Sequence, residues 1–417
     1  MSFISDVLKR TVAIPCFSQN LSAIAVAAIV LSLAACGGGS SNSSTAASGT
    51  PAVQDAGMSA AAQLGEKIFK DVSLSASGKM SCATCHDADN AHAQKNDLSV
   101  QLGGPNLDVP GFRAVPSLRY LDLTPAFFFA SDGTPTGGFT RDGRVNTLAQ
   151  QAETPFLAAH EMANKNRADV VTKLQRASYV SEFRSVFGNT IFDNTDTAFE
   201  RILYSLQQYQ KEDSDFHPYD SKYDQFLAGR AKLSDAELRG LALFNNPVKG
   251  NCAACHISNK SANGAPPLFT DFTFDNLGVP RNTAIPATAD PAYFDLGLCG
   301  PDRTDLTTRA DLCGAFKVPT LRNVATRKVF FHNGKFKTLR DAVNFYVRRD
   351  TNPEEWFPYG ANGNVVKFND LPAAYVANVN TKEVPYNRQR GMAPALSSDE
   401  VDDVVKFLAT LNDGYKP

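Results

Sequence analysis

The sequence predicts a mainly α-helical fold made of two similar domains. The chain has 417 residues, of which 43% are apolar and 20% charged, so it is ordinary in composition and long enough for two domains. A C-x-x-C-H motif occurs twice, at Cys82–His86 and at Cys252–His256. Each copy follows a segment that has apolar residues at helical spacing. The formal net charge of −2 offers no field that would attract nucleic acid, which makes that class of partner a poor candidate.

Residues 1–35 are typical of a secretory signal, because Lys9 and Arg10 precede an apolar run too short to span a bilayer. The run ends in L-A-A-C-G, which resembles the lipobox of bacterial lipoproteins, with Cys36 as the lipidated first residue of the mature chain. The alternative is cleavage at another small residue of the same stretch. Residues 36–57 are mostly Gly, Ser, Thr and Ala and are expected to form a flexible tether. We therefore expect a periplasmic protein held at the outer membrane by its lipid.

Three helices are predicted from their apolar periodicity. The helix before the first motif has an apolar face formed by Leu64, Ile68 and Phe69. The helix before the second motif begins with a capping box, Ser234 and Glu237, and its expected apolar face is Leu238, Leu241, Ala242 and Leu243. The closing helix follows Ser398 as its N-cap, ends at Asp413-Gly414 and has an apolar face of Val401, Val404, Val405, Leu408 and Leu411.

The two domains are predicted at residues 58–225 and 226–417. Each begins with a helix and a motif, and long loops rich in proline and glycine join the helices. Residues 257–330 lack helical periodicity and are expected to be a loop that covers the second motif.

The C-x-x-C-H motif is the attachment signal for c-type haem. Its two thiols lie about one helical turn apart and add to the two vinyl groups of one porphyrin, which leaves the adjacent imidazole beneath the iron. Cys82, Cys85 and His86 are therefore predicted to hold a first haem. A thioredoxin-like pair or a zinc site is the competing interpretation, but each pair carries its own histidine and lies outside a βαβ pattern.

The same chemistry predicts that Cys252, Cys255 and His256 hold a second haem, so each domain is expected to be cytochrome c-like. Once Cys16 is assigned to the signal and Cys36 to lipidation, only Cys299 and Cys313 remain. In an oxidising periplasm these two are expected to form a structural disulfide.

Further motifs resemble those of the bacterial di-haem cytochrome c peroxidases and the related MauG enzymes. The resemblance extends from about Leu64 to Leu411. Besides the haem motifs it rests on Val115-Pro116-Ser117-Leu118, Asp142-Gly143-Arg144 followed by Leu148, Gln151 and Pro155, Glu161-Met162, Phe274–Pro280, Phe316–Asn323 and His332-Asn333-Gly334.

The resemblance implies that hydrogen peroxide is reduced at the first haem. Its open face would be served by the residues that match the family's glutamine and glutamate, Gln151 and Glu161, with Glu161 as the proton shuttle. Arg144 is expected to pair with a haem propionate or a carboxylate, and His160 to be structural or to tune Glu161. The electrons would come from an unknown donor: a small cytochrome, a cupredoxin or a substrate protein.

The first haem departs from the family pattern in its distal ligand. Many family peroxidases place a second histidine about sixteen residues after the haem histidine, where this chain has Leu102. The nearest alternative, His92, follows His86 too closely to cross to the other haem face. The first iron is therefore predicted to have no sixth protein ligand.

The expected axial ligand of the second haem also departs from the family pattern. Where the peroxidases have an axial methionine, this chain has Tyr346, as MauG has a tyrosine in the matching place. Met392, just before the closing helix, is the alternative ligand. A phenolate stabilises the ferric state more than a thioether does.

Two further departures lie between the domains. Arg141 replaces a tryptophan that stands between the haems of family members, which puts the usual electron route in doubt, and the only tryptophan here is Trp356. The inter-domain calcium of relatives is possible but doubtful, because Ala114 and Lys328 replace residues of the family pattern.

The leading hypothesis is a di-haem c-type peroxidase whose second haem relays or stores oxidising equivalents. The alternatives are a non-catalytic di-haem electron carrier and an oxygenase on the same scaffold. His217 and His332 are given structural roles, and the doublet Arg348-Arg349 is expected to lie on a solvated face.

Overall fold

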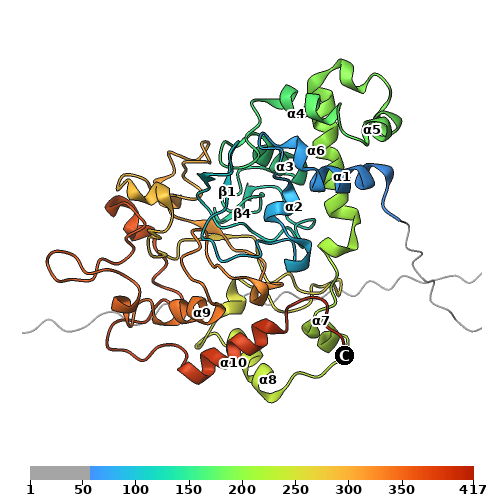
Figure 1. Cartoon of the computed structure of the whole chain (residues 1–417). Helices are drawn as coiled ribbons and strands as arrows, with labels where there is room; N and C mark the ends of the chain where they lie inside the picture. Colours follow the sequence, from blue (N-terminus) through green and yellow to red (C-terminus); the bar gives the residue numbers. More distant parts are fainter. Residues whose placement is uncertain (1–56) are drawn as a thin grey trace, which may run out of the picture. The chain divides into compact units, whose positions relative to one another are not determined.

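The computed structural model of the chain describes residues 57–417 (Figure 1). The predicted signal, Cys36 and the tether up to residue 56 lie outside the described residues. Within them the fold is mainly helical with little sheet, as predicted. No helix of this part of the chain is both long and apolar enough to cross a membrane.

The helices and strands alternate with long irregular segments. The α-helices of the described part are α1 (Ala60–Lys70), α2 (Cys82–Cys85), α3 (Leu148–Leu157), α4 (Arg167–Leu174), α5 (Val180–Phe187), α6 (Thr195–Glu212), α7 (Lys222–Leu227), α8 (Asp235–Asn245), α9 (Leu339–Arg348) and α10 (Ser398–Ala409). The short strands pair antiparallel, β1 (Leu102–Gly103) with β2 (Val109–Pro110), β3 (Phe128–Phe129) with β4 (Pro135–Thr136), and β5 (Phe274–Asp275) with β6 (Phe316–Lys317). Residues 257–330 contain only these last strands and single-turn 3₁₀ helices, in agreement with the predicted loop.

Two large hydrophobic clusters form the interior. The first core draws its buried residues from Leu64 to Phe216 and includes α1, α3 and α6. The second core draws on Tyr223 to Leu411 and includes α8, α9 and α10. The change from one core to the other thus falls close to the predicted boundary at residue 225, although the domain limits themselves stay a prediction.

Each core contains one helix pair that crosses very closely. In α1 a Cβ atom on Gly65 would lie 2.0 Å from the carbonyl oxygen of Ser205 in α6. In α8 a Cβ atom on Gly240 would lie 2.0 Å from the carbonyl oxygen of Asp403 in α10. Because any side chain would clash with the facing backbone, glycine is required at both crossings.

The close crossings explain which of the predicted apolar helix faces are buried in the structure and which are not. The predicted face of α1 is confirmed, since Leu64, Ile68 and Phe69 are all buried. The predicted face of α8 is wrong in part, because Leu238 is 42% exposed and Ala242 is also exposed. The helix buries Gly240 and Phe244 instead, because the close approach of α10 selects the face that carries the glycine.

The start and the buried face of α10 are nearly as predicted. Val401, Val404 and Leu408 are buried in the second core, as is Leu411 just after the helix, while Val405 is only partly buried. The N-cap is Ser397, one residue before the predicted Ser398, because the Ser397 hydroxyl accepts from the Glu400 amide and completes a capping box.

Asp413, just after α10, ties the two cores together. Its carboxylate accepts hydrogen bonds from the Tyr120 hydroxyl at 2.6 Å and from the Arg119 guanidinium at 3.1 Å, both in the first part of the chain. It also accepts one from the Asn323 side chain. A single carboxylate thus links segments about 300 residues apart, by sequence separations of 293 and 294.

Arg349 corrects the expectation of a solvated basic doublet. Its side chain is 0% exposed, donates to the Asp350 carboxylate at 2.7 Å and also donates to the carbonyl oxygens of Leu277 and Asn380. These partners satisfy the guanidinium, so the interior accepts the charge. Arg348 pairs with Glu355 at the surface.

Candidate functional site

One cavity reaches both C-x-x-C-H motifs. Its volume is about 720 Å³, and its wall includes both cysteines and the histidine of each motif. Residues of the first core and of the second core both contribute to it. The two motifs, about 170 residues apart in sequence, therefore open onto one continuous space.

The first motif forms a single helical turn. Cys82 to Cys85 make up α2, and the Thr84 hydroxyl accepts from the Ser81 amide at 3.0 Å, which caps this turn. The His86 ring donates through Nδ1 to the carbonyl oxygen of His92 at 3.1 Å. That bond leaves Nε2 as the ring nitrogen for an iron.

His92 supports this arrangement from behind. Its ring is 1% exposed, stacks on Phe216 with centroids 4.0 Å apart, and donates through Nε2 to Asp215 at 2.8 Å. These contacts fix the position of the His92 backbone carbonyl, which accepts the hydrogen bond from the His86 ring. His92 is therefore a structural residue, which agrees with the expectation that it does not cross to the other face of the first haem.

The second motif is built in the same way with a different turn. Cys252 to Ala254 form a 3₁₀ turn, and His256 donates through Nδ1 to the carbonyl oxygen of Phe269 at 2.8 Å. Burial lowers the pKa of both motif histidines, that of His86 to about 4. A neutral imidazole is the form that binds a metal.

The four motif cysteines fit a c-type haem better than a metal or redox site. All four are free thiols, and burial is the main reason that the pKa rises to about 12 for Cys82 and Cys252. A buried thiol with a raised pKa is a poor nucleophile and a poor zinc ligand. Among residues 57–417 there is also no group of three or more His, Cys, Asp or Glu side chains that could hold a metal ion. Paired thiols, an imidazole and a roomy, largely apolar cavity match the needs of a porphyrin.

Glu161 and Gln151 enter the same cavity beside the first motif. Gln151 lies in α3, and Glu161 lies in the turn after it. Burial raises the pKa of Glu161 to about 7, against an opposing effect of Arg144, and Oε2 of this carboxyl has no hydrogen-bond partner. Glu161 in turn contributes, after burial, to the raised pKa of Cys85, which shows that the two groups are close.

Arg144 pairs with carboxylates at the edge of this region. Its guanidinium donates to both oxygens of Asp142 at 3.0 and 2.8 Å and lies 3.5 Å from Asp302. The ring of the neighbouring His160 packs edge-on against Phe112, with centroids 4.7 Å apart. The structure thus gives Arg144 the carboxylate partner that was one of its two expected partners.

Leu102 lies in β1, directly before Gly103 and Gly104, whose backbone contacts the turn that carries Glu161. A Cβ atom on Gly103 would lie 2.3 Å from the carbonyl oxygen of His160, and the Gly104 amide donates to the Glu161 carbonyl at 2.8 Å. These contacts hold the Glu161 turn against β1. Leu102 itself, at the position where many family peroxidases are expected to have a second histidine, has an aliphatic side chain that is 47% exposed.

The two candidate ligands of the second haem, Tyr346 and Met392, have different surroundings in the structure. Tyr346, in α9, lines the cavity, and its ring lies 6.0 Å from that of Tyr386, another cavity residue. Burial raises the pKa of Tyr346 well above its ordinary value. Met392 is 47% exposed, is absent from the cavity wall, and its sulfur accepts from the Gln389 amide at 3.3 Å.

Arg141, the residue expected from the resemblance at the family's tryptophan position, also lines the cavity and donates to the carbonyl of Ala114 at 3.1 and 2.9 Å. Trp356 does not replace that tryptophan. It packs on Phe336 and Phe345 in the second core, with ring centroids 5.7 Å apart in both cases. The inter-domain calcium of relatives, which Ala114 and Lys328 put in doubt, is not tested by these contacts.

Several residues of the cavity wall escaped the sequence analysis. They are Tyr386 and the basic side chains Arg113, Lys317 and Arg327. Lys317 directly precedes the second of two similar segments, Val115-Pro116-Ser117-Leu118 and Val318-Pro319-Thr320-Leu321, and that repeat is a signal that could have drawn attention to it. Nothing in the local sequence marks Arg327 or Tyr386. Away from the haem motifs, the sulfur atoms of Cys299 and Cys313 lie 1.91 Å apart, at disulfide distance.

The comparisons with known proteins agree with this geometry. The family model "Di-haem cytochrome c peroxidase" matches residues 59–232. The methylamine utilization protein MauG of Paracoccus denitrificans is 34% identical over 373 residues, which span 86% of this chain and 90% of that protein. The cytochrome c551 peroxidase of Nitrosomonas europaea is 28% identical over 70% of this chain and 74% of its own.

A solved structure extends the likeness to three dimensions. The dihaem peroxidase BthA from Burkholderia thailandensis superposes with a TM-score of 0.77 and 38% sequence identity, over 85% of this chain and 86% of that chain. The chain therefore belongs to the bacterial family of di-haem cytochrome c peroxidases and MauG proteins, a membership that implies two c-type haems.

Proposed function

We propose that the chain is a peroxidase that reduces hydrogen peroxide at a haem held by Cys82, Cys85 and His86. A second haem, held by Cys252, Cys255 and His256, would relay or store the oxidising equivalents. The haems supply redox-active irons, and the first supplies an open position for peroxide. Overall, two electrons and two protons convert one peroxide into two waters, and the protein must deliver both.

The observation that carries the proposal is the Glu161 carboxyl beside the first motif. Its pKa of about 7 means that it can both accept and return a proton near neutral pH, which is the property that a general acid and base needs. The unpartnered Oε2 leaves a lone pair free to accept a proton from peroxide. Glu161 would take this proton from one peroxide oxygen and give it to the departing one.

Gln151 and Arg144 would assist this transfer. The Gln151 amide faces the cavity from α3 and would donate a hydrogen bond to peroxide or to a water there. Arg144 lowers the pKa of Glu161 against the effect of burial and so favours the ionised carboxylate that accepts the proton. The absence of a histidine at the Leu102 position would leave the first iron open without a prior activation step.

For the second haem we propose Tyr346 as the axial ligand. Its place in the cavity wall supports this choice over Met392, whose side chain is partly exposed and outside that wall. A phenolate favours the oxidised iron, so this haem would store an oxidising equivalent rather than act as a high-potential relay. The electron donor would then be an oxidisable protein, a small cytochrome or a cupredoxin.

The setting of the enzyme is proposed from the sequence. Lipidation at Cys36 would hold it in the periplasm at the outer membrane, and a Cys299–Cys313 disulfide would suit that compartment.

Stopped-flow mixing with hydrogen peroxide tests the proposal. Glu161→Gln keeps the size of the side chain but removes the base, and it should lower the second-order rate constant by about 10²- to 10⁴-fold. Glu153→Gln is the matched control, because Glu153 lies in the same region, pairs with Arg167 and is absent from the cavity wall. Its rate should equal that of the wild type.

Three results would overturn the proposal. If the Glu161→Gln variant reacted as fast as the wild type, Glu161 would not be the proton shuttle. If the wild type were inert toward peroxide and both irons were fully ligated, the chain would be an electron carrier. If dioxygen reacted without added peroxide, the oxygenase hypothesis would replace this one.

A further inference from the structure

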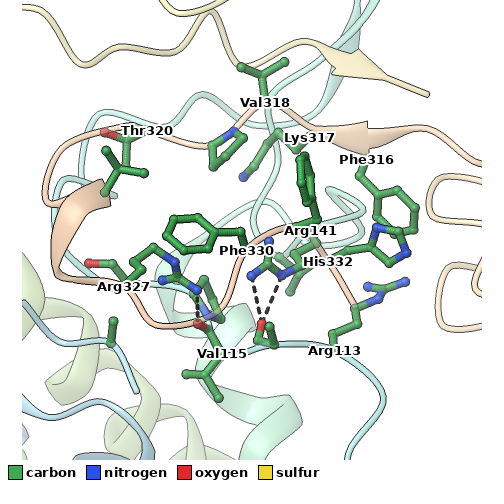
Figure 2. Close-up of a pocket in the computed structure, with 18 of the residues that line it drawn as sticks. Arg113, Val115, Arg141, Phe316, Lys317, Val318, Thr320, Arg327, Phe330 and His332 are labelled. Carbon is green, nitrogen blue, oxygen red and sulfur yellow. Dashed lines mark hydrogen bonds between the residues drawn. The ribbon is translucent and has the colours of Figure 1, made fainter. Parts of the chain in front are cut away.

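Three basic side chains meet in the cavity wall between the two motifs. They are Arg141, Lys317 and Arg327, and Figure 2 shows them directed toward a common space. We call them the basic cluster. Arg141 comes from the first part of the chain, whereas Lys317 and Arg327 come from the second.

Backbone carbonyls are the only acceptors that the described residues offer to this cluster. Arg141 donates to the Ala114 carbonyl, Arg327 donates to the Val115 carbonyl at 2.8 Å and to that of Val329 at 3.3 Å, and Lys317 donates to the Gly138 carbonyl. None of the three forms an ion pair with a carboxylate anywhere in residues 57–417. Arg113, a neighbour in the wall, differs in this respect, because Asp295 and Asp142 bind it at 2.6 and 2.7 Å.

Three cations bound only by backbone carbonyls lose part of their hydration without gaining a carboxylate partner. Burial lowers the pKa of Arg141 to about 9, that of Lys317 to about 8 and that of Arg327 to about 10. After burial, Arg327 lowers the pKa of Arg141 further, so these two charges repel one another, whereas Asp295 raises the pKa of Arg141 and Asp142 raises that of Lys317. Both carboxylates form ion pairs with Arg113. Carbonyl dipoles offset only part of such a penalty, and charges withdrawn from bulk water are usually paired. The three side chains are only partly covered by protein and lie in the cavity wall, where an anion could reach them.

The position of the cluster connects it with both haem sites. Arg327 binds the carbonyl of Val115, and the next residue, Pro116, supports His86 through its backbone. Lys317 stands two residues before Pro319, which supports His256 in the same way. The Lys317 amide also donates to the Arg141 carbonyl at 2.9 Å, which joins the two sides.

We propose that the basic cluster is one shared binding site for the propionate carboxylates of both haems. A c-type haem is attached at its vinyl edge, and its two propionates leave from the opposite edge of the ring, so they must find cations away from the cysteines. The cluster supplies three cations at a place that both sites reach. This inference rests on the proposed two-haem function, and it assigns the residue at the family's tryptophan position an electrostatic role.

A shared site has a measurable signature. Removing one cation should make both haems easier to oxidise, whichever part of the chain the cation comes from, because both sets of propionates lose the same counter-charge. For Arg141→Gln the ferrous-to-ferric ratio of each haem at a fixed potential should fall about tenfold. Arg141→Lys should restore most of the shift, and the exposed, surface-paired Arg340→Gln is the matched control that should shift neither haem.

Spectroelectrochemical titration in the absence of peroxide measures these ratios for each haem of the intact protein. Joint shifts in Arg141→Gln and Arg327→Gln support the shared site. Unchanged potentials in both variants, or a shift of only one haem, would overturn it. Purified protein with fewer than two haems would instead refute the proposed function, so the two failures are distinguishable.

A measurement on the wild type keeps the inference testable if a variant fails to fold. With isotopic labels on the porphyrin carboxyls, infrared spectra should show propionates that stay ionised below a pH of about 4, where ordinary carboxyls protonate. A protonated propionate band near neutral pH would contradict the cluster's role. So would a shift of the wild-type potentials on addition of inorganic phosphate, because it would identify a site for a small free anion.

Discussion

Glu161→Gln should make the folded protein more stable and, at the same time, slow its reaction with peroxide. The pKa of Glu161 rises from an ordinary value of 4.5 to about 7, mainly through burial. The unfolded chain therefore releases this proton at lower pH than the folded chain does. Folding loses stability as the pH rises from 4.5 to about 7, and above that range the loss is about 3 kcal/mol. A neutral glutamine avoids this loss.

Urea unfolding of the haem-loaded protein at several pH values checks the reasoning. The two proteins should have similar free energies of unfolding below pH 4.5, and the variant should gain by about 3 kcal/mol at pH 8. In the same samples the wild-type peroxide rate should rise with pH through about 7 and that of the variant should stay low and flat. A variant that is no more stable than the wild type at pH 8 would refute the claim that Glu161 is a destabilised, unpartnered carboxylate.

Three more substitutions, two of them with a matched control, test other features. Tyr346→Phe should change the ferric absorption spectrum of one haem and raise the reduction potential of that haem. If the variant and the wild type had the same ferric spectra at both haems, Tyr346 would be excluded as a ligand. Gly240→Ala should lower the free energy of unfolding by about 1 to 3 kcal/mol in urea, because its Cβ would lie 2.0 Å from a backbone oxygen, whereas Leu238→Ala on the exposed face of α8 should cost under about 0.5 kcal/mol. Arg349→Met should cost about 3 kcal/mol in the same assay and Arg348→Met under about 1 kcal/mol, and equal costs would contradict the different burial of the doublet.

Local patterns predicted the parts of the fold that depend on local forces. Leu64, Ile68 and Phe69 follow the helical period and are buried in α1 as expected, and the capping box of Ser234 and Glu237 opens α8. Residues 257–330 lack that period and contain little regular structure. In each of these cases the relevant energy comes from neighbours within a few turns of the chain.

The errors arose where a distant segment decides the outcome. The face of α8 depends on where α10 crosses it, and only the fold reveals that Gly240 marks this crossing. Arg349 looks like a surface residue until Leu277 and Asn380 supply carbonyl oxygens from other loops. The basic cluster is of the same kind, because Arg141 and Arg327 are nearly 190 residues apart and nothing in either sequence neighbourhood shows that they face one cavity.

Asp413 has a thermodynamic consequence. Its carboxylate pairs with Arg119 and Tyr120 beside the first core and with Asn323 beside the second. If either core melted alone, these hydrogen bonds to a charged carboxylate would be exchanged for bonds to water, at a net cost of about 1 to 3 kcal/mol each. Heating should therefore disrupt both cores in one calorimetric transition, so that the two haem environments share a single melting temperature.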